Sequence, residues 1–435
     1  MKGRLIVFTR FPEPGRCKTR LIPFLGEKNA AGLHRRMSAL AIGAARDFCR
    51  KDPDWEIEIR FSGGDAEKMA GLYGPGLFRP QSSGSLGRRM REAMDRALSK
   101  GASRAVLFGC DCPGVSADLL ARACGLVKKN DLVLGPALDG GYWLIGTGRT
   151  QEALFSADMP WGSDRVLEKT LAAARSLGLS PALLPPLADV DLPSDLARIF
   201  HSPLMADLPE PVISVIIPTL NEEKRLPAAI KSARAPSTEI IVADGGSADA
   251  TLDAARNAGA FGVLSPRGRG TQQNAGAARA RGRILLFLHA DTRLPERFGA
   301  DVIDMLSRPG ASAGAFRLGI SGSHPARGMV AFFANLRSAW LQLPYGDQAL
   351  FVLKDVFEKA GGFPDAPIME DYELVLKLKK MGRVRLASRA VSTSGRRWDE
   401  LGFFKTLLIN QAMIMGRRLK VGPKTLEKWY RYFKS

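Results

Sequence analysis

The sequence of 435 residues contains no long hydrophobic run. Its longest apolar stretches, such as residues 284–288, are far shorter than the roughly 18 to 20 residues that a membrane-spanning helix needs. The apolar stretch at the N-terminus ends at Arg10, which is too early for the hydrophobic region of a signal peptide. We therefore expect a cytoplasmic protein without a transmembrane helix.

Cysteine is also scarce, and there is no CxxC pair with the spacing of a zinc site. The five cysteines are Cys17, Cys49, Cys110, Cys112 and Cys124. An odd number of cysteines in a reducing compartment argues against a disulfide framework. We expect reduced thiols, with Cys110 and Cys112 as packing residues. The GxxxxGK[ST] motif of a Walker A loop is absent as well.

Acidic residues are few at the C-terminal end. Residues 376–435 carry sixteen Lys and Arg against three Asp and Glu, so +13 of the net charge of +19 lies there. The rest of the chain is mildly basic and no aromatic-interleaved motif accompanies the charges, so we expect no specific nucleic acid partner. Residues 402–415 are apolar and are followed by cations, which permits peripheral contact with an anionic inner membrane face. The alternative is a helix that covers a core.

A proline-rich segment at 181–211 indicates a linker and divides the chain into two domains, residues 1–206 and 207–435. Each domain begins with an apolar strand that leads into a polar loop and a helical pattern. Short apolar strands that alternate with helices predict an α/β fold with two successive, mostly parallel sheets covered by helices. Ligands bind such sheets at the carboxyl ends of the strands.

The expected strands share short apolar runs bounded by turn residues. They lie at residues 4–8, 55–61, 105–109, 131–135 and 142–146 in the first half, and at 212–218, 239–243, 283–288 and 314–320 in the second. A helix is expected over residues 86–99.

An apolar strand runs straight into an aspartate in each half, at Asp111 and at Asp291. A carboxylate at the carboxyl end of a strand is well placed to hold a divalent cation that bridges phosphates. The alternative is that each aspartate caps the turn or helix that follows.

Several motifs of the second half fall in a fixed order: VISVIIPTLNEEKRLPAAIKSA, IIVADGGSADATLDAA, RGRGTQQNAGAARARGRILLFLHADTRLP, and a long segment that contains MEDYELVLKLKKMG. Together they resemble the family 2 glycosyltransferases, which have the GT-A fold. The resemblance implies transfer of a sugar from a nucleotide-sugar donor to a small-molecule acceptor. Such transfer needs cations for the leaving diphosphate and a base for the acceptor proton.

The resemblance also implies the residues that contact the donor. Those at the nucleoside are Pro218, Asn221, Glu222 and Asp244, and those along the diphosphate are Arg267, Arg269 and Asn274. A flexible basic loop is the alternative for the segment from 267. Near the leaving diphosphate, the match is looser and covers Arg396, Arg397 and Trp398, which could equally form a solvated basic face.

For catalysis, the resemblance implies that Asp371 is the general base and that Glu370 is its orienting neighbour or substitute. Acidic residues are also favoured at the start of a helix by the macrodipole. The cation, Mg²⁺ or Mn²⁺, would be held by Asp291. The usual DxD motif reads His289-Ala290-Asp291 here, which leaves the metal dependence of this half open, and Gly245 replaces a residue that is often acidic.

Four cations crowd a tight loop after the first strand. They are Arg10, Arg16, Lys18 and Arg20, and the segment TRFPEPGRCKTRL that holds them is suited to gripping phosphates.

Further motifs of the first half are QSSGSLGRRMREAM, VLFGCDCPGVSADLL, LGPALDGGYWLIG and ADVDLPSDLA. They resemble bacterial GT-A-like transferases that are related to sugar-phosphate and cofactor nucleotidyltransferases. The resemblance implies that Lys18 and Arg20 neutralise a di- or triphosphate, and that Asp111 and Asp191 hold a metal. The acceptor pocket would be shaped by Asp139, Gly140, Gly141 and Tyr142, or these form a buried strand with a glycine turn.

The two halves together resemble a pair of transferases that are associated with radical SAM enzymes and assigned to arsenosugar biosynthesis. We therefore expect a bifunctional transferase, in which the first half performs nucleotidyl or glycosyl transfer in the same pathway as the second. The alternative is that one half is a catalytically silent, nucleotide-binding scaffold or regulator of the other.

Overall fold

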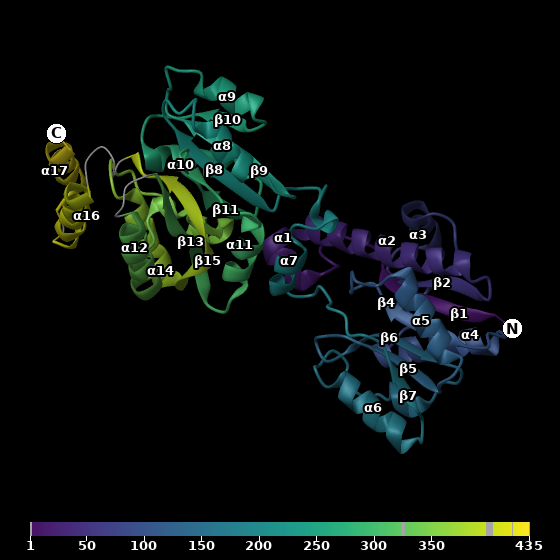
Figure 1. The fold of residues 1–435 in the computed structure, drawn as a ribbon. Helices are drawn as coiled ribbons and strands as arrows, with labels where there is room; N and C mark the ends of the chain where they lie inside the picture. The colour runs from purple at the N-terminus through teal and green to yellow at the C-terminus, as the bar shows by residue number, and fades with distance from the viewer. Residues whose placement is uncertain (1, 323–326, 397–402, 420, 435) are drawn as a thin grey trace. The chain divides into compact units, whose positions relative to one another are not determined.

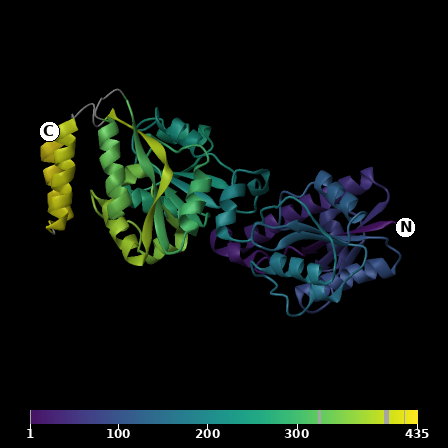
Figure 2. The same ribbon diagram turned by 60° about the horizontal axis from the view of Figure 1, so that its bottom comes forward.

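The computed structural model describes residues 2–322, 327–396, 403–419 and 421–434. The chain divides into two compact units, the first formed by Met1–Ile22 and Glu27–Asp195, the second by Pro23–Gly26 and Leu196–Ser435 (Figure 1). In each unit, helices lie on both faces of one sheet, as the turned view in Figure 2 also shows.

The sheet of the first unit has seven strands in the order β3-β2-β1-β4-β6-β5-β7. The strands are β1 (Gly3–Arg10), β2 (Trp55–Ser62), β3 (Phe78–Pro80), β4 (Ala105–Gly109), β5 (Leu132–Pro136), β6 (Tyr142–Thr147) and β7 (Pro181–Leu183). Only β6 runs antiparallel to its neighbours β4 and β5. In the central strand β1, Leu5, Ile6 and Val7 are fully buried, because helices cover both faces of the sheet.

The helices of the first unit follow its strands. They are α2 (Glu27–Lys51), α3 (Ala66–Tyr73), α4 (Leu86–Ser99), α5 (Ala117–Val127) and α6 (Val166–Ser176), with 3-10 helices η1 (Thr19–Leu21) and η2 (Glu152–Phe155). Short helices α1 (Ile22–Leu25) and α7 (Pro193–Ile199) lie at the points of division. Helix α4 begins where the Ser85 hydroxyl accepts a hydrogen bond from the Arg88 backbone N–H, as an N-cap does.

The sheet of the second unit has eight strands in the order β10-β9-β8-β11-β14-β13-β15-β12. They are β8 (Ile213–Thr219), β9 (Thr238–Asp244), β10 (Phe261–Leu264), β11 (Ile284–Phe287), β12 (Thr292–Arg293), β13 (Ala311–Ser321), β14 (Phe351–Leu353) and β15 (Arg383–Ser394). The first four in this order are parallel, and β14 runs antiparallel between β11 and β13.

The helices of the second unit complete the three-layered arrangement. They are α8 (Leu226–Ser232), α9 (Thr251–Asn257), α10 (Arg269–Arg279), α11 (Phe298–Ser307), α12 (Arg327–Leu341), α13 (Lys354–Lys359), α14 (Glu370–Met381), α16 (Phe403–Arg418) and α17 (Pro423–Lys434), with η3 (Pro203–Met205) and η4 (Gly346–Gln348).

The expected fold class, α/β with two mostly parallel sheets covered by helices, is confirmed. The division differs from the expected boundary between 206 and 207. The reason is that Phe200 is fully buried and its ring packs beside Gly299 of α11, so the segment after Asp195 belongs to the core of the second unit.

Candidate active sites

A cavity of about 650 Å³ lies in the second unit at the carboxyl ends of β8 and β11. Nine of the residues expected at the donor and catalytic sites line it: Pro218, Glu222, Arg267, Arg269, His289, Asp291, Glu370, Asp371 and Arg396. These residues come from the loops after two strands, the start of α10, the start of α14 and the end of β15. Asp291 and Asp371 therefore share one cavity.

Asp371 is held by two backbone N–H groups. Its Oδ2 accepts from Gly346 at 2.6 Å and its Oδ1 accepts from Tyr372 at 2.7 Å. The second donor belongs to the first turn of α14, whose N–H groups have no partner within the helix. Each carboxylate oxygen keeps a further lone pair, so Asp371 is fixed in direction and can still accept a proton.

Glu370, by contrast, is buried, with 2% of its side chain exposed, and its Oε1 lies 3.3 Å from Nη1 of Arg269. Burial and the neighbouring Asp371 carboxylate raise the pKa of Glu370 to about 6, while the Arg269 guanidinium works in the opposite direction. This arrangement makes Glu370 the residue that holds Arg269 against the cavity wall. Its ion-pair partner is Arg269 and not Asp371, so the expected role as the orienting neighbour or substitute of Asp371 stays a prediction.

His289 lines the cavity with a neutral imidazole. Burial, with a smaller contribution from Arg269, lowers the pKa of His289 to about 3, so the imidazole is neutral. Its Nε2 is buried and has no hydrogen-bond partner among the described residues. The imidazole and the carboxylate of Asp291 line the same cavity, and a neutral imidazole together with a carboxylate can ligate Mn²⁺.

Three residues expected at the donor lie off the cavity and have structural roles instead. Asp244 is fully buried, and it accepts hydrogen bonds from the Thr219 hydroxyl at 3.1 Å and from the backbone N–H of Ser247 at 2.8 Å. Asn221 accepts from the N–H of Ala248 through its side chain. These bonds use the polar atoms to hold the loops after β8 and β9.

Asn274 is the third of these residues. Its side chain donates to the carbonyl oxygen of Phe363 at 2.9 Å and accepts from the N–H of Phe363 at 3.0 Å. Both ends of the amide are therefore engaged by one backbone unit, and Asn274 anchors the loop that leads to α14 instead of lying along a diphosphate. The remaining expected residues, Arg397 and Trp398, lie outside the described residues.

The structure adds cavity residues that sequence reasoning missed. Gln272 and Tyr345 line the cavity, and so do Met413 and Ile414 of α16 and Tyr430 of α17. The QQN segment was visible in the sequence, but nothing in it indicated which glutamine faces the ligand.

For helix α16 the sequence left two interpretations open, a peripheral membrane contact or a helix that covers a core. Ile409 and Met413 are buried against Leu426 of α17 and against Ile368 and Met369 before α14. The alternative, a helix that covers a core, is the correct one for this face, because these side chains have apolar partners within the unit.

A second cavity, of about 430 Å³, lies in the first unit at the carboxyl ends of β1 and β4. All four cations of the loop line it, together with the acidic and aromatic residues expected nearby: Arg10, Arg16, Lys18, Arg20, Asp111, Tyr142 and Asp191. The loop therefore collects positive charge at one cavity, as expected for phosphate binding.

Lys18 lies between the two carboxylates that were expected to hold a metal. Its Nζ is 2.5 Å from Asp111 Oδ1 and 3.9 Å from Asp191 Oδ1, and it also donates to the carbonyl oxygen of Val190 at 2.6 Å. Burial alone would lower the pKa of Lys18, but Asp111 outweighs it and the pKa is raised. The space between the carboxylates is thus taken by an ammonium group, so these residues do not fit a metal as arranged.

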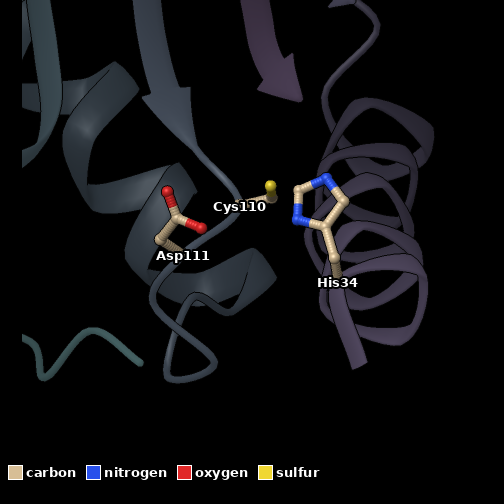
Figure 3. Close-up of side chains that lie close together, drawn as sticks. All are labelled: His34, Cys110 and Asp111. Carbon is tan, nitrogen blue, oxygen red and sulfur yellow. The ribbon is translucent and has the colours of Figure 1, made fainter. Parts of the chain in front are cut away.

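Among the described residues, one group of three has metal-ligating atoms within 4.8 Å of one another, namely His34, Cys110 and Asp111. Figure 3 shows the sulfur of Cys110 pointing toward the His34 ring. Burial raises the pKa of the Cys110 thiol to about 11 and lowers the pKa of His34, so both are neutral. The thiol lies 3.5 Å from the Thr9 hydroxyl and Asp111 is paired with Lys18, which makes this a hydrogen-bonded packing group.

Three residues of the DGGY segment lie off this cavity: Asp139, Gly140 and Gly141. Gly140 has φ +88°, and a Cβ there would lie 2.0 Å from the carbonyl oxygen of Asp164, so this position requires glycine for the fold. Asp139 accepts from the N–H of Gly141 at 2.9 Å and closes the turn. The glycine-turn alternative is correct for these three, and only Tyr142 reaches the cavity.

Sequence reasoning also missed two polar residues of the first cavity. Gln81 donates to the carbonyl oxygens of Thr9 and Arg60, and its Oε1 accepts from Arg89 at 2.7 Å. Arg89 is thereby aimed at the cavity as a fifth cation.

In the described part of the chain, no helix is both long and apolar enough to cross a membrane. Residues 46–163 match a family described as an uncharacterised protein conserved in bacteria, DUF2064. Residues 214–358 match glycosyl transferase family 2.

Individual proteins are also similar to parts of the chain. A dolichyl-phosphate beta-glucosyltransferase from Drosophila melanogaster is 38% identical over 116 residues, which are 22% of this chain, and the chain spans 36% of that relative's length. A protein described as a nucleotide-diphospho-sugar transferase, from Desulfovibrio desulfuricans G20, is 33% identical over 46% of this chain and 88% of its own, with a TM-score of 0.43. A glucosyl-3-phosphoglycerate synthase from Mycobacterium tuberculosis, solved with Mn²⁺ and UDP, is 22% identical over 44% of this chain and 75% of its own, with a TM-score of 0.34. The chain therefore carries a DUF2064 region in its first unit and a glycosyl transferase family 2 region in its second.

Proposed function

We propose that the second unit transfers a sugar from a nucleotide-sugar donor to a hydroxyl acceptor, with Asp371 as the general base. The observation that carries this proposal is that Asp291, Asp371, Arg267 and Arg269 line one cavity. The proposal is supported by two carboxylates and two guanidinium groups around the same space, in a unit whose residues 214–358 match glycosyl transferase family 2.

Arg267 and Arg269 stabilise the leaving group. As the bond between the anomeric carbon and the diphosphate breaks, negative charge develops on the diphosphate oxygens, and Arg267 and Arg269 stabilise that charge by charge-assisted hydrogen bonds. Arg269 is held in place by the buried carboxylate of Glu370, so its guanidinium needs little reorganisation during the reaction.

Asp371 serves the acceptor. The acceptor hydroxyl loses its proton to a free lone pair of Asp371 as its oxygen forms the new bond to the anomeric carbon, and the nucleoside diphosphate leaves with the electron pair of the broken bond. The two N–H donors on Asp371 fix the direction from which it takes the proton.

A divalent cation would be held by Asp291 and the unpaired nitrogen of His289. When bound, such a cation neutralises charge on the diphosphate. Relatives solved with Mn²⁺ and a nucleotide support its inclusion in the proposal.

For the first unit, we propose binding of the phosphate chain of a nucleotide by the loop cations and Arg89, in support of nucleotidyl or glycosyl transfer. The alternative of a silent scaffold applies to this unit first, because Lys18 occupies the place expected for a metal. The assignment to arsenosugar biosynthesis stays a prediction of the resemblance.

Incubation of the purified chain with UDP- and GDP-sugars and Mn²⁺ tests the function of the second unit. We expect release of free nucleoside diphosphate, and we expect Asp371→Asn to lower kcat by about 100-fold or more, since general bases contribute in that range. A suitable control is Asp355→Asn, which removes an exposed carboxylate of α13. Full turnover by Asp371→Asn would show that the base is assigned wrongly.

The exposed side chains of α12 and α17 favour an accessory contact with an anionic membrane, and α17 belongs to the basic C-terminal segment for which such contact was expected. Phe332 and Trp340 of α12 are 61% and 79% exposed, and Tyr432 of α17 is 79% exposed. On α17, the exposed Lys428 and Arg431 accompany the aromatic side chains. Aromatic and cationic groups on one amphipathic helix suit the interface of an anionic bilayer.

A further inference from the structure

Gln272 of α10 has an amide whose orientation is fixed. Its Nε2 donates to the carbonyl oxygen of Thr219 at 2.6 Å and to that of Ala243 at 2.8 Å, at the ends of the neighbouring strands β8 and β9. Carbonyl oxygens only accept hydrogen bonds, so the nitrogen must be the end that faces them. Both amide hydrogens are used, and Oε1 is left as an acceptor.

This acceptor belongs to the cavity of the second unit. Gln272 is 5% exposed and lines the cavity, and no described residue donates a hydrogen bond to its Oε1. Gln272 also lies one helical turn after Arg269, and side chains three residues apart share one face of a helix. The acceptor is therefore one turn away from the cation proposed to contact the diphosphate, toward the ends of β8 and β9.

Gly245 provides the space for this side chain. A Cβ at position 245 would lie 3.0–3.1 Å from the amide atoms of Gln272, so the amide would have to shift by a few tenths of an ångström. The backbone of Gly245 is not in the left-handed region, so this steric contact, and not the backbone conformation, disfavours a larger residue here. The position at which an acidic residue was expected thus receives an amide oxygen from α10.

The free acceptor Oε1 of Gln272 can discriminate among nucleobases. At the centre of the base-pairing edge, uracil (N3) and guanine (N1) carry an N–H, whereas cytosine (N3) and adenine (N1) carry a lone pair. Gln272 Oε1 can accept a hydrogen bond from uracil or guanine. Both amide hydrogens of Gln272 are already used, so it cannot donate to cytosine or adenine. An unpaired polar atom in such a site is costly for binding.

We propose that Gln272 Oε1 reads the central N–H of the donor's nucleobase, and that the second unit consequently selects uridine or guanosine diphosphate sugars over those of cytidine and adenosine. This proposal rests on the proposed function of the second unit and names its substrate class. The selecting group is a neutral amide supplied by α10.

Calorimetric titration of the full chain with UDP, GDP, CDP and ADP in the presence of Mn²⁺ tests the proposal without altering the protein. We expect UDP or GDP to bind at least about tenfold more tightly than CDP and ADP. The matching N-methylated nucleotide, 3-methyl-UDP or 1-methyl-GDP, should lose that advantage, because it lacks the N–H. Equal affinity for the methylated and unmethylated forms, or for all four bases, overturns the role of Gln272.

The variant Gly245→Ala adds an independent test. Its Cβ shifts the Gln272 amide by a few tenths of an ångström out of its hydrogen-bonding position, so the preference for UDP or GDP over CDP should shrink, while the control Gly328→Ala, where nothing lies within 4 Å of an added Cβ, should keep it. An unchanged preference in Gly245→Ala overturns the proposal. Turnover of nucleotide sugars without base preference contradicts this inference alone, whereas no turnover with any sugar nucleotide contradicts the proposed function.

Discussion

His289 and Asp371, which precede and follow Gly346 in the sequence, both approach this glycine. A Cβ added at Gly346 would lie 2.9 Å from His289 Nε2 and 3.0 Å from Asp371 Oδ2. The N–H of Gly346 is also the donor that holds Asp371. A residue without a side chain is what allows the imidazole and the carboxylate to converge here.

The variant Gly346→Ala is therefore expected to disturb the chemistry of the second unit more than its binding of donor. The methyl group pushes against the proposed base and the His289 nitrogen, so we expect kcat for nucleotide-sugar turnover to fall at least about tenfold, with a smaller change in the Kd of the donor nucleotide. Steady-state kinetics and calorimetry separate the two effects. Equal turnover by Gly346→Ala and by the control Gly328→Ala would contradict the proposed convergence.

The raised pKa of Glu370 predicts a dependence of stability on pH. In the folded chain Glu370 keeps its proton up to about pH 6, whereas the unfolded carboxyl loses it near its ordinary value of 4.5. The folded state then binds more protons between these values, so the contribution of Glu370 to the free energy of unfolding falls as pH rises from about 4.5 to 6.

Glu370→Gln has no titrating group and should lack this fall. Relative to the wild-type chain, its free energy of unfolding should rise across that window by on the order of 1–2 kcal/mol. Urea unfolding of both proteins at several pH values measures the difference. A difference that stays constant, or that changes in the opposite direction, would show that burial does not raise this pKa.

Lys18 is predicted to contribute a binding site for phosphate in the first unit. We expect Lys18→Met to weaken binding of inorganic pyrophosphate to this unit at least about tenfold, because it removes the ammonium group and leaves Asp111 to repel the anion. Calorimetry on the full chain should show one fewer class of site. Lys51→Met, which alters an exposed lysine at the end of α2, is the control. Retention of all sites in Lys18→Met would exclude a role in phosphate binding.

The glycine turn after β5 makes a prediction about stability alone. Gly140→Ala combines a positive φ with a contact of 2.0 Å to backbone, so we expect a loss of about 2 kcal/mol or more in the free energy of unfolding. Gly141→Ala has no positive φ, and its Cβ would meet the Asp139 carboxylate at 3.2 Å, so its effect should be smaller. Chemical denaturation compares the two, and equal losses would contradict the structural role of Gly140.

Membrane contact is predicted to depend on both lipid charge and aromatic side chains. The chain should sediment with vesicles that contain phosphatidylglycerol, less with phosphatidylcholine alone, and less as salt rises. The double variant Trp429→Ser and Tyr432→Ser should weaken this binding, whereas Leu138→Ser, at a 65% exposed position of the first unit, should not. Vesicle binding that depends neither on lipid charge nor on the aromatic residues would contradict the proposed contact.

The parts of the fold that the sequence predicted are those with a continuous apolar signal. The strands at 105–109 and 142–146 and the helix at 86–99 were expected within one residue of β4, β6 and α4. Strand β15 was missed because its sequence includes several Arg and Ser residues and has no continuous apolar run. Strand β14 was missed because it has only three residues, and the antiparallel direction of β6 was missed because apolar periodicity carries no information on direction.

The residues of the candidate sites also differ in how well the sequence predicted their positions. Residues next to strand ends, such as Asp111 and Asp291, reached the expected cavities because the topology of the sheet places them there. Asp244 and Asn274 do not line a cavity, because their polar atoms form hydrogen bonds with loops. The hydrogen-bond partners of such side chains, like those of Gln272, depend on packing between segments that are distant in the sequence.

The wall that α16 and α17 contribute to the cavity has a consequence for how the reaction is protected. Met413, Ile414 and Tyr430 line the cavity together with the acidic and cationic residues and come from beyond the matched family region, which ends at residue 358. In the proposed reaction these side chains would exclude bulk water, which otherwise competes with the acceptor for the activated sugar. The ratio of transfer to hydrolysis is therefore predicted to depend on a segment that lies outside the family match.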